Sequence, residues 1–170
     1  MTTSLKEAIV AAFTGVAYPG DDCLTVYLAA GHDYDETFQL LRGKSWQEFP
    51  AAEFITGDTP IPDLSPEAFH YYMPALLLAS IDASFDRSGD VASSLIFHLS
   101  PSSAKQTEGE FPYDCTETYN RRMALFSEGQ RAVMIRVLED YLARGWANQE
   151  RIAETVEYLF HPQRLKEPNP

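Results

Sequence analysis

The stretch that decides the fold is Asp63–Phe85, DLSPEAFHYYMPALLLASIDASF. Ser65 is a residue type that caps helices, and Pro66 at the first helical position loses no hydrogen bond, so the sequence predicts a helix that begins here. The apolar residues of this stretch surround the helix instead of forming one stripe, which is typical of a central, buried helix. Pro74 removes one backbone hydrogen bond in its middle, so we expect a kink there.

Helix signals also dominate the rest of the chain. Ser4 with Glu7, and Ser127 with Gln130, have the spacing of capping boxes, and Gly145 is placed to end the helix that the second box begins. Apolar residues at helical spacing predict further helices at Ser4–Phe13, Asp35–Leu41, Asp90–Leu99 with Asp90 as its cap, Thr116–Leu125 and Asn148–Phe160. For Cys23–Ala30 the pattern leaves open a short strand and a buried helical turn.

These signals predict an all-α fold. We expect one domain over residues 1–162, built as a compact bundle of six or seven helices with irregular loops and at most one short strand or hairpin. Residues 163–170 are expected to form a disordered tail. A chain of 170 residues, 45% of them hydrophobic, is large enough to bury a core without a disulfide or a metal.

Charge is distributed unevenly along the chain, whose net charge is −12. Residues 1–119 hold 5 Lys and Arg against 18 Asp and Glu, a net of −13, whereas residues 120–170 hold 8 against 7, a net of +1. An acidic surface repels phosphate backbones and anionic lipids, so we expect neither nucleic acid nor membrane as a partner. The simple interpretation of this asymmetry is solubility. The functional one is an acidic face for a basic protein, built from Asp21, Asp22, Asp33, Asp35 and Glu36.

The sequence contains no arrangement of residues that predicts a reaction. HExxH, nucleotide-binding loops and a nucleophile elbow are all missing, and the four histidines are isolated from one another. The two cysteines lack close partners and the first residues do not resemble a signal peptide, so we expect free thiols and a cytoplasmic location. We therefore assign no catalytic residue, no metal and no cofactor, and we favour a non-enzymatic role without excluding an enzyme.

Two further groups of residues each have a structural and a functional interpretation. His70, Tyr71 and Tyr72 are candidates for lining a pocket at the Pro74 kink, although a core histidine with a hydrogen-bond partner is the simpler interpretation of His70, and of His98 too. The arginines at 121, 122, 131, 136, 144 and 151 are expected to form ion pairs with Glu128, Glu139, Asp140 and Glu154, or else to mark an anion or partner site.

The central segment also carries a resemblance. Leu64–Phe69, Tyr71-Tyr72 and Pro74-Ala75 resemble the signature of a bacterial family of unknown function, with members of about this length. Ala12-Phe13, Trp46, and Ser127 with Gln130 match further features of that family. The resemblance implies a bacterial domain with no assigned reaction.

From these observations we expect an acidic protein-binding domain, similar in class to immunity or antitoxin-like inhibitors, whose carboxylates cover a basic partner. The alternative is a small-ligand binder or enzyme with its pocket at the kinked helix. The sequence sets no oligomeric state.

Overall fold

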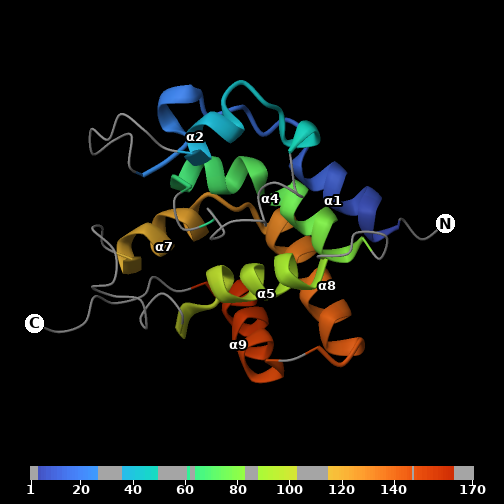
Figure 1. Cartoon of the computed structure of the whole chain (residues 1–170). Helices are drawn as coiled ribbons and strands as arrows, with labels where there is room; N and C mark the ends of the chain where they lie inside the picture. The colour runs from blue at the N-terminus through green and yellow to red at the C-terminus, as the bar shows by residue number, and fades with distance from the viewer. Residues whose placement is uncertain are drawn as a thin grey trace, which may run out of the picture.

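The helix that the central segment predicts, α4 (Pro66–Ile81), runs through the middle of the molecule (Figure 1). A computed structural model of the chain describes residues 4–26, 36–49, 61, 64–82, 88–102, 115–146 and 148–162. The Ser65 hydroxyl accepts a hydrogen bond from the Ala68 amide at 3.0 Å, and Pro66 is the first helical residue, as the sequence predicts. The helix continues through Pro74, which is buried.

Both predicted capping boxes are present. At the start of α1 (Leu5–Phe13) the Glu7 amide donates to the Ser4 hydroxyl at 3.2 Å, and the Ser4 amide donates to the Glu7 carboxylate at 2.9 Å. Ser127 and Gln130 make the same reciprocal pair at the start of α8 (Glu128–Ala143).

Helix α8 ends where Gly145 predicts that it should. Gly145 has a φ of 71°, a left-handed conformation that favours glycine. Its amide donates to the Leu142 carbonyl at 3.0 Å, and the Trp146 amide donates to the Tyr141 carbonyl at 3.2 Å. The rings of Tyr141 and Trp146 lie 5.3 Å apart, so the two ends of this Schellman motif also pack together.

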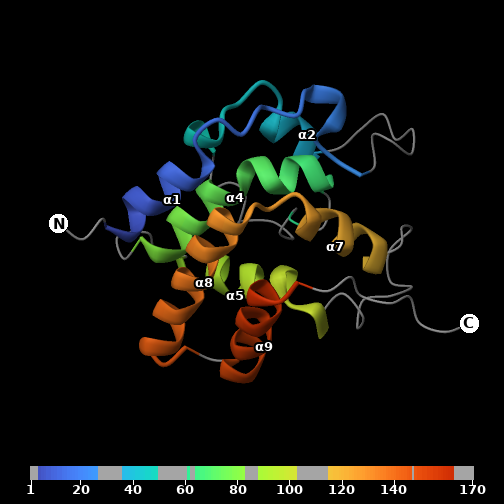
Figure 2. The same cartoon turned by 180° about the vertical axis from the view of Figure 1, so that it is seen from behind.

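The remaining helices surround α4 on several sides. Figures 1 and 2 show α2 (Glu36–Leu41) on one side of α4, and α5 (Ser88–Leu99) with α9 (Gln149–Phe160) on the other. Helix α4 contacts α1, α5, α8, α7 (Cys115–Ala124) and the 3₁₀ helix η3 (Trp46–Glu48), and α8 also contacts α1 and α9. The seven α-helices of the described residues confirm the prediction of an all-α bundle.

The segment that the sequence leaves open forms a turn and a single bridge. Asp21–Cys23 is a 3₁₀ helix, and Thr25 forms an isolated antiparallel bridge with Leu64. The Ser65 amide donates to the Leu24 carbonyl at 3.1 Å, which ties this segment to the start of α4. Residues 27–30, and the tail expected at 163–170, lie outside the described residues.

The predicted start of α5 is wrong by two residues. The helix begins at Ser88, so Asp90 lies in its first turn instead of capping it. Both positions suit an aspartate, because the carboxylate interacts favourably with the helix dipole at the cap and in the first turn alike.

None of the described helices combines the length and the hydrophobicity that a membrane-spanning helix requires.

Candidate functional site

Two concave surfaces flank the short turn between α7 and α8. The first, which we call the His70 hollow, has a volume of about 560 Å³ and lies where the end of α1 meets α4 and α8. Glu67 and His70 line it from α4, Ser127 and Gln130 line it from the start of α8, and the loop after α1 closes one side. His70 is thus the one member of the predicted pocket group that reaches a concave surface among those described.

The side chain of Gln130 fixes which nitrogen of His70 carries a proton. Gln130 Oε1 accepts from the Ser127 amide at 2.9 Å and lies 3.0 Å from His70 Nε2. A backbone amide only donates, so the atom facing both groups is the oxygen, and Nε2 must be the protonated nitrogen. The neutral imidazole therefore carries its free lone pair on Nδ1, which has no hydrogen-bond partner among the described residues.

The His70 ring also packs against aromatic side chains. It lies 5.1 Å from the ring of Phe126 and 6.2 Å from that of Phe13, with tilted or edge-to-face geometry. This is the half-buried, hydrogen-bonded core histidine that the simpler interpretation of the sequence predicts. His98 differs, since it makes no hydrogen bond with a described residue. Burial is the main cause that lowers its pKa to about 3, and the nearby charge of Arg122 acts in the same direction.

Tyr71 and Tyr72 do not line the His70 hollow. The Tyr72 hydroxyl lies 2.9 Å from the Lys44 carbonyl and 3.1 Å from that of Leu41, and burial raises its pKa. The Tyr71 ring is buried and packs edge to face on Tyr18 at 5.3 Å. Tyr71 therefore packs Tyr18 against α4, and Tyr72 holds residues 41–44 against the same helix.

The predicted acidic face is only partly free to meet a partner. Asp21 accepts hydrogen bonds from the Tyr18 hydroxyl at 2.5 Å, the Gly43 amide at 3.1 Å and Arg42 Nε at 3.2 Å. The bond from Tyr18 is the main cause that lowers the pKa of Asp21, while burial and Asp21 raise the pKa of Tyr18 to about 12. Asp22 is exposed and has no partner among the described residues.

Of the other three acidic candidates, one lies at the start of a described helix. Glu36 is the first residue of α2, and Asp33 and Asp35 lie outside the described residues. Tyr18 lines the His70 hollow while its hydroxyl binds Asp21. The structure thus places the start of the acidic face next to the hollow that contains His70, a proximity that the sequence does not predict.

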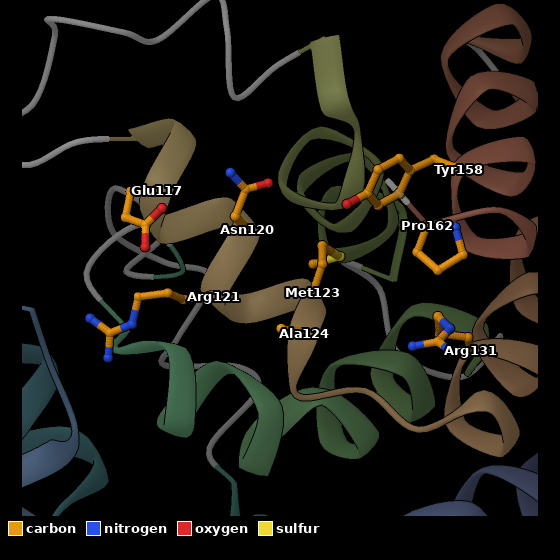
Figure 3. Close-up of a pocket in the computed structure, with 8 residues that line it drawn as sticks. All are labelled: Glu117, Asn120, Arg121, Met123, Ala124, Arg131, Tyr158 and Pro162. Carbon is orange, nitrogen blue, oxygen red and sulfur yellow. The ribbon is translucent and has the colours of Figure 1, made fainter. Parts of the chain in front are cut away.

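The second concave surface is a pocket between α7 and α9, with a volume of about 380 Å³ (Figure 3). Its lining residues are Glu117, Asn120, Arg121, Met123, Ala124, Arg131, Tyr158 and Pro162. Met123 and the Tyr158 hydroxyl point into the space between the two helices, whereas Glu117 and Arg121 point away from Tyr158 on the other side of α7. We call this cavity the α7–α9 pocket.

The polar groups of this pocket come from three helices. Arg131 of α8 donates one hydrogen bond, from Nη1 to the Phe126 carbonyl. Burial raises the pKa of the Tyr158 phenol, and its hydrogen bond with Tyr119 and the charge of Arg131 act in the opposite direction. Tyr158 is therefore a neutral phenol at physiological pH, beside a guanidinium.

Among the described residues, the arginines between 121 and 151 include one in a predicted ion pair and one in an ion pair that the sequence does not predict. Arg144 pairs with Asp140 at 2.7 Å, but Arg121 pairs with Glu67 of α4 at 3.4 Å, so this pair bridges the rims of the two concave surfaces. Arg122 is buried, donates to the carbonyls of Leu64 and Ile61, and lies over the Phe69 ring. The partners of Arg121 and Arg122 are remote in sequence, so helical spacing does not predict them.

The α7–α9 pocket is not among the sites that the sequence predicts, although one signal for it exists. Side chains on a helix lean toward its N-terminus, so Arg131, four residues after the Ser127 cap, was bound to lean toward the turn before α8. The described residues contain no group of three or more His, Cys, Asp or Glu side chains that could hold a metal ion.

Comparison with known proteins gives a family and no activity. A family model described as "Family of unknown function (DUF6714)" matches residues 1–160. The search of curated proteins and that of solved structures found no match. Because the family model covers nearly the whole chain, the chain belongs to the DUF6714 family.

Proposed function

We propose that this protein binds a small organic molecule in the α7–α9 pocket. The observation that carries the proposal is the composition of that pocket. Met123, Ala124 and Pro162 supply an apolar surface, and polar groups converge on it from separate helices. A cavity of about 380 Å³ with this lining is typical of small-molecule sites.

The described lining favours binding over catalysis. It includes no histidine, serine or cysteine, and its one carboxylate, Glu117, points away from Tyr158 (Figure 3). The Tyr158 phenol has a raised pKa and is a poor base at neutral pH. A ligand held here meets hydrogen-bonding groups and apolar surface, but no group suited to act as nucleophile or base.

Filling the pocket tests this proposal. Ala124 is exposed at the end of α7 and lines the pocket, so Ala124→Phe should occupy the cavity without disturbing the core. Ala132, exposed on α8 and outside the lining, provides the matched control Ala132→Phe. We expect fragments that perturb the amide signals of Met123 and Tyr158 to lose binding in Ala124→Phe and keep it in Ala132→Phe. Equal binding in both variants would contradict the proposal.

The acidic face is a second candidate function, and Asp22 is the observation that favours it. Most described acids of the first half are engaged: Glu7 and Glu48 in capping boxes, Asp21 with Arg42. Asp22 is exposed without a described partner, in the part of the chain with a net charge of −13, and it directly follows Asp21, whose partner Tyr18 lines the His70 hollow. We propose that a basic protein docks here, as an immunity or antitoxin-like inhibitor would require.

The test compares two exposed acids. Asp22→Asn should weaken capture of a basic protein at low salt, whereas Glu139→Gln, an exposed acid on α8, should leave capture unchanged. Added salt should release the partner, because steering between exposed charges is screened. Capture that resists salt, or that both variants reduce equally, would rule out this docking surface.

A further inference from the structure

We infer that the ligand of the α7–α9 pocket is a small oxyanion, with its charged oxygen atoms at Arg131 and its apolar part against Met123 and Ala124. This inference rests on the proposed function and adds the chemical class of the ligand. Three observations support it: the unused hydrogen-bond donors of Arg131, the orientation of the neighbouring charges, and the protonation state of Tyr158.

Arg131 has no anionic partner among the residues that the structure describes. A guanidinium carries five N–H donors, and within this part of the chain Arg131 uses one of them, toward the Phe126 carbonyl. It forms no ion pair with a described carboxylate. The neighbouring arginines differ, since Arg121 pairs with Glu67 and Arg144 with Asp140.

Partial burial makes this missing partner significant. Arg131 is half-buried, so fewer water molecules reach it than reach an exposed arginine such as Arg136. Removing a charge from water is unfavourable unless an opposite charge or hydrogen bonds replace the lost hydration. An oxyanion in the pocket would supply both, because the planar guanidinium matches carboxylate and phosphate oxygens in a two-pronged geometry.

The rest of the pocket suits the same kind of ligand. Among the described lining residues Glu117 is the only carboxylate, and it points away on the far side of α7, so it does not oppose an anion beside Arg131 (Figure 3). The Tyr158 hydroxyl is uncharged and is hydrogen-bonded to the hydroxyl of Tyr119, whose own proton goes to the Leu99 carbonyl, so Tyr158 places no negative charge beside an anion. The apolar side chains next to it limit the ligand to a compact molecule with an apolar part.

A series of compounds with the same apolar part tests the charge directly. We would titrate 3-phenylpropionate, 3-phenylpropionamide, 3-phenylpropylamine and 2-phenylethylphosphonate into the full chain, up to about 10 mM, the range expected for ligands of this size. A hydrogen bond to a charged group contributes more binding free energy than one between neutral groups. We therefore expect the two anions to bind about tenfold more tightly than the amide, and the amine to bind more weakly than the amide. The stronger of the two anions identifies carboxylate or phosphorus chemistry.

Two variants connect this preference to Arg131. Arg131→Gln should remove the tenfold preference, whereas Arg136→Gln on the same helix should retain it, because Arg136 is exposed and outside the lining. Arg131→Lys keeps the charge and should retain part of the preference, so it replaces Arg131→Gln if that variant does not fold.

The possible outcomes separate the two claims. If the amide and the anions bind equally at Met123 and Tyr158, the inference about charge is wrong and the proposed pocket remains. If none of the four compounds perturbs these residues, the pocket itself is refuted. Binding of the anions that persists in Arg131→Gln would also overturn the inference, because another group would then hold the charge.

Discussion

Acidification should destabilise the protein through His98. Its imidazole has a folded-state pKa of about 3, caused by burial and by the neighbouring charge of Arg122, whereas an unfolded histidine titrates near its ordinary value of 6.5. Between these two values the unfolded chain binds a proton that the folded chain does not. The free energy of unfolding must therefore fall as the pH falls through this window.

The size of this effect follows from the two pKa values. Each pH unit below 6.5 lowers the free energy of unfolding by at most about 1.4 kcal/mol. From pH 7 to pH 5, where His98 stays neutral in the folded state, the loss amounts to about 2 kcal/mol. Above pH 7 the contribution of His98 to stability is fully present and constant.

Urea denaturation followed by circular dichroism at pH 7, 6 and 5 measures the loss. The wild-type protein should lose about 2 kcal/mol more than His98→Gln over this range, because glutamine does not titrate. His161→Gln, the same substitution at an exposed histidine that follows α9, is the matched control. Parallel curves for wild type and His98→Gln would refute the reasoning.

Three further predictions concern stability, each measured by urea denaturation at pH 7. Arg122→Met should lower the free energy of unfolding by about 3 kcal/mol, because two carbonyl groups in the core lose a charged donor. Arg121→Met breaks an exposed ion pair and should lower it by less than about 1 kcal/mol. Equal losses in the two variants would contradict this prediction. Ser65→Ala removes the cap of α4 and should cost about 1–2 kcal/mol, and an unchanged midpoint would show that the cap contributes nothing. Gly145→Ala should destabilise the protein by about 1 kcal/mol, because Gly145 has a positive φ that alanine disfavours. Gly129→Ala lies in open space inside α8 and should be neutral or stabilising by up to about 1 kcal/mol. The opposite order of stabilities would contradict this prediction.

The helix starts could be predicted from the sequence because their causes are local. Ser65 caps α4 through the amide of Ala68, only three residues away, and Ser127 with Gln130 forms a capping box over the same distance. Such hydrogen bonds depend on residue type and spacing, which the sequence contains in full. The start of α5 was missed because serine and aspartate both suit the first positions of a helix.

The candidate sites could not be predicted in the same way, because their residues meet only after folding. The α7–α9 pocket brings Asn120 and Tyr158 to one cavity, and their positions depend on how α7 packs on α4 and how α9 packs on α8 and α5. Asp21 was predicted to face a partner, but the fold places Arg42 and the Gly43 amide next to it. A charge pattern indicates how many carboxylates a segment holds, not which of them the fold will engage.

The hydrogen bond between Gln130 and His70 has a consequence for how the molecule opens in acid. Nε2 donates to the Gln130 oxygen, so α4 and α8 are joined here by a hydrogen bond that involves no carboxylate. His98 has no such arrangement, and its protonation places a second positive charge beside Arg122. Amide hydrogen exchange at mildly acidic pH should therefore accelerate in α5 while the first turns of α8 stay protected. Local unfolding in acid would then begin at α5.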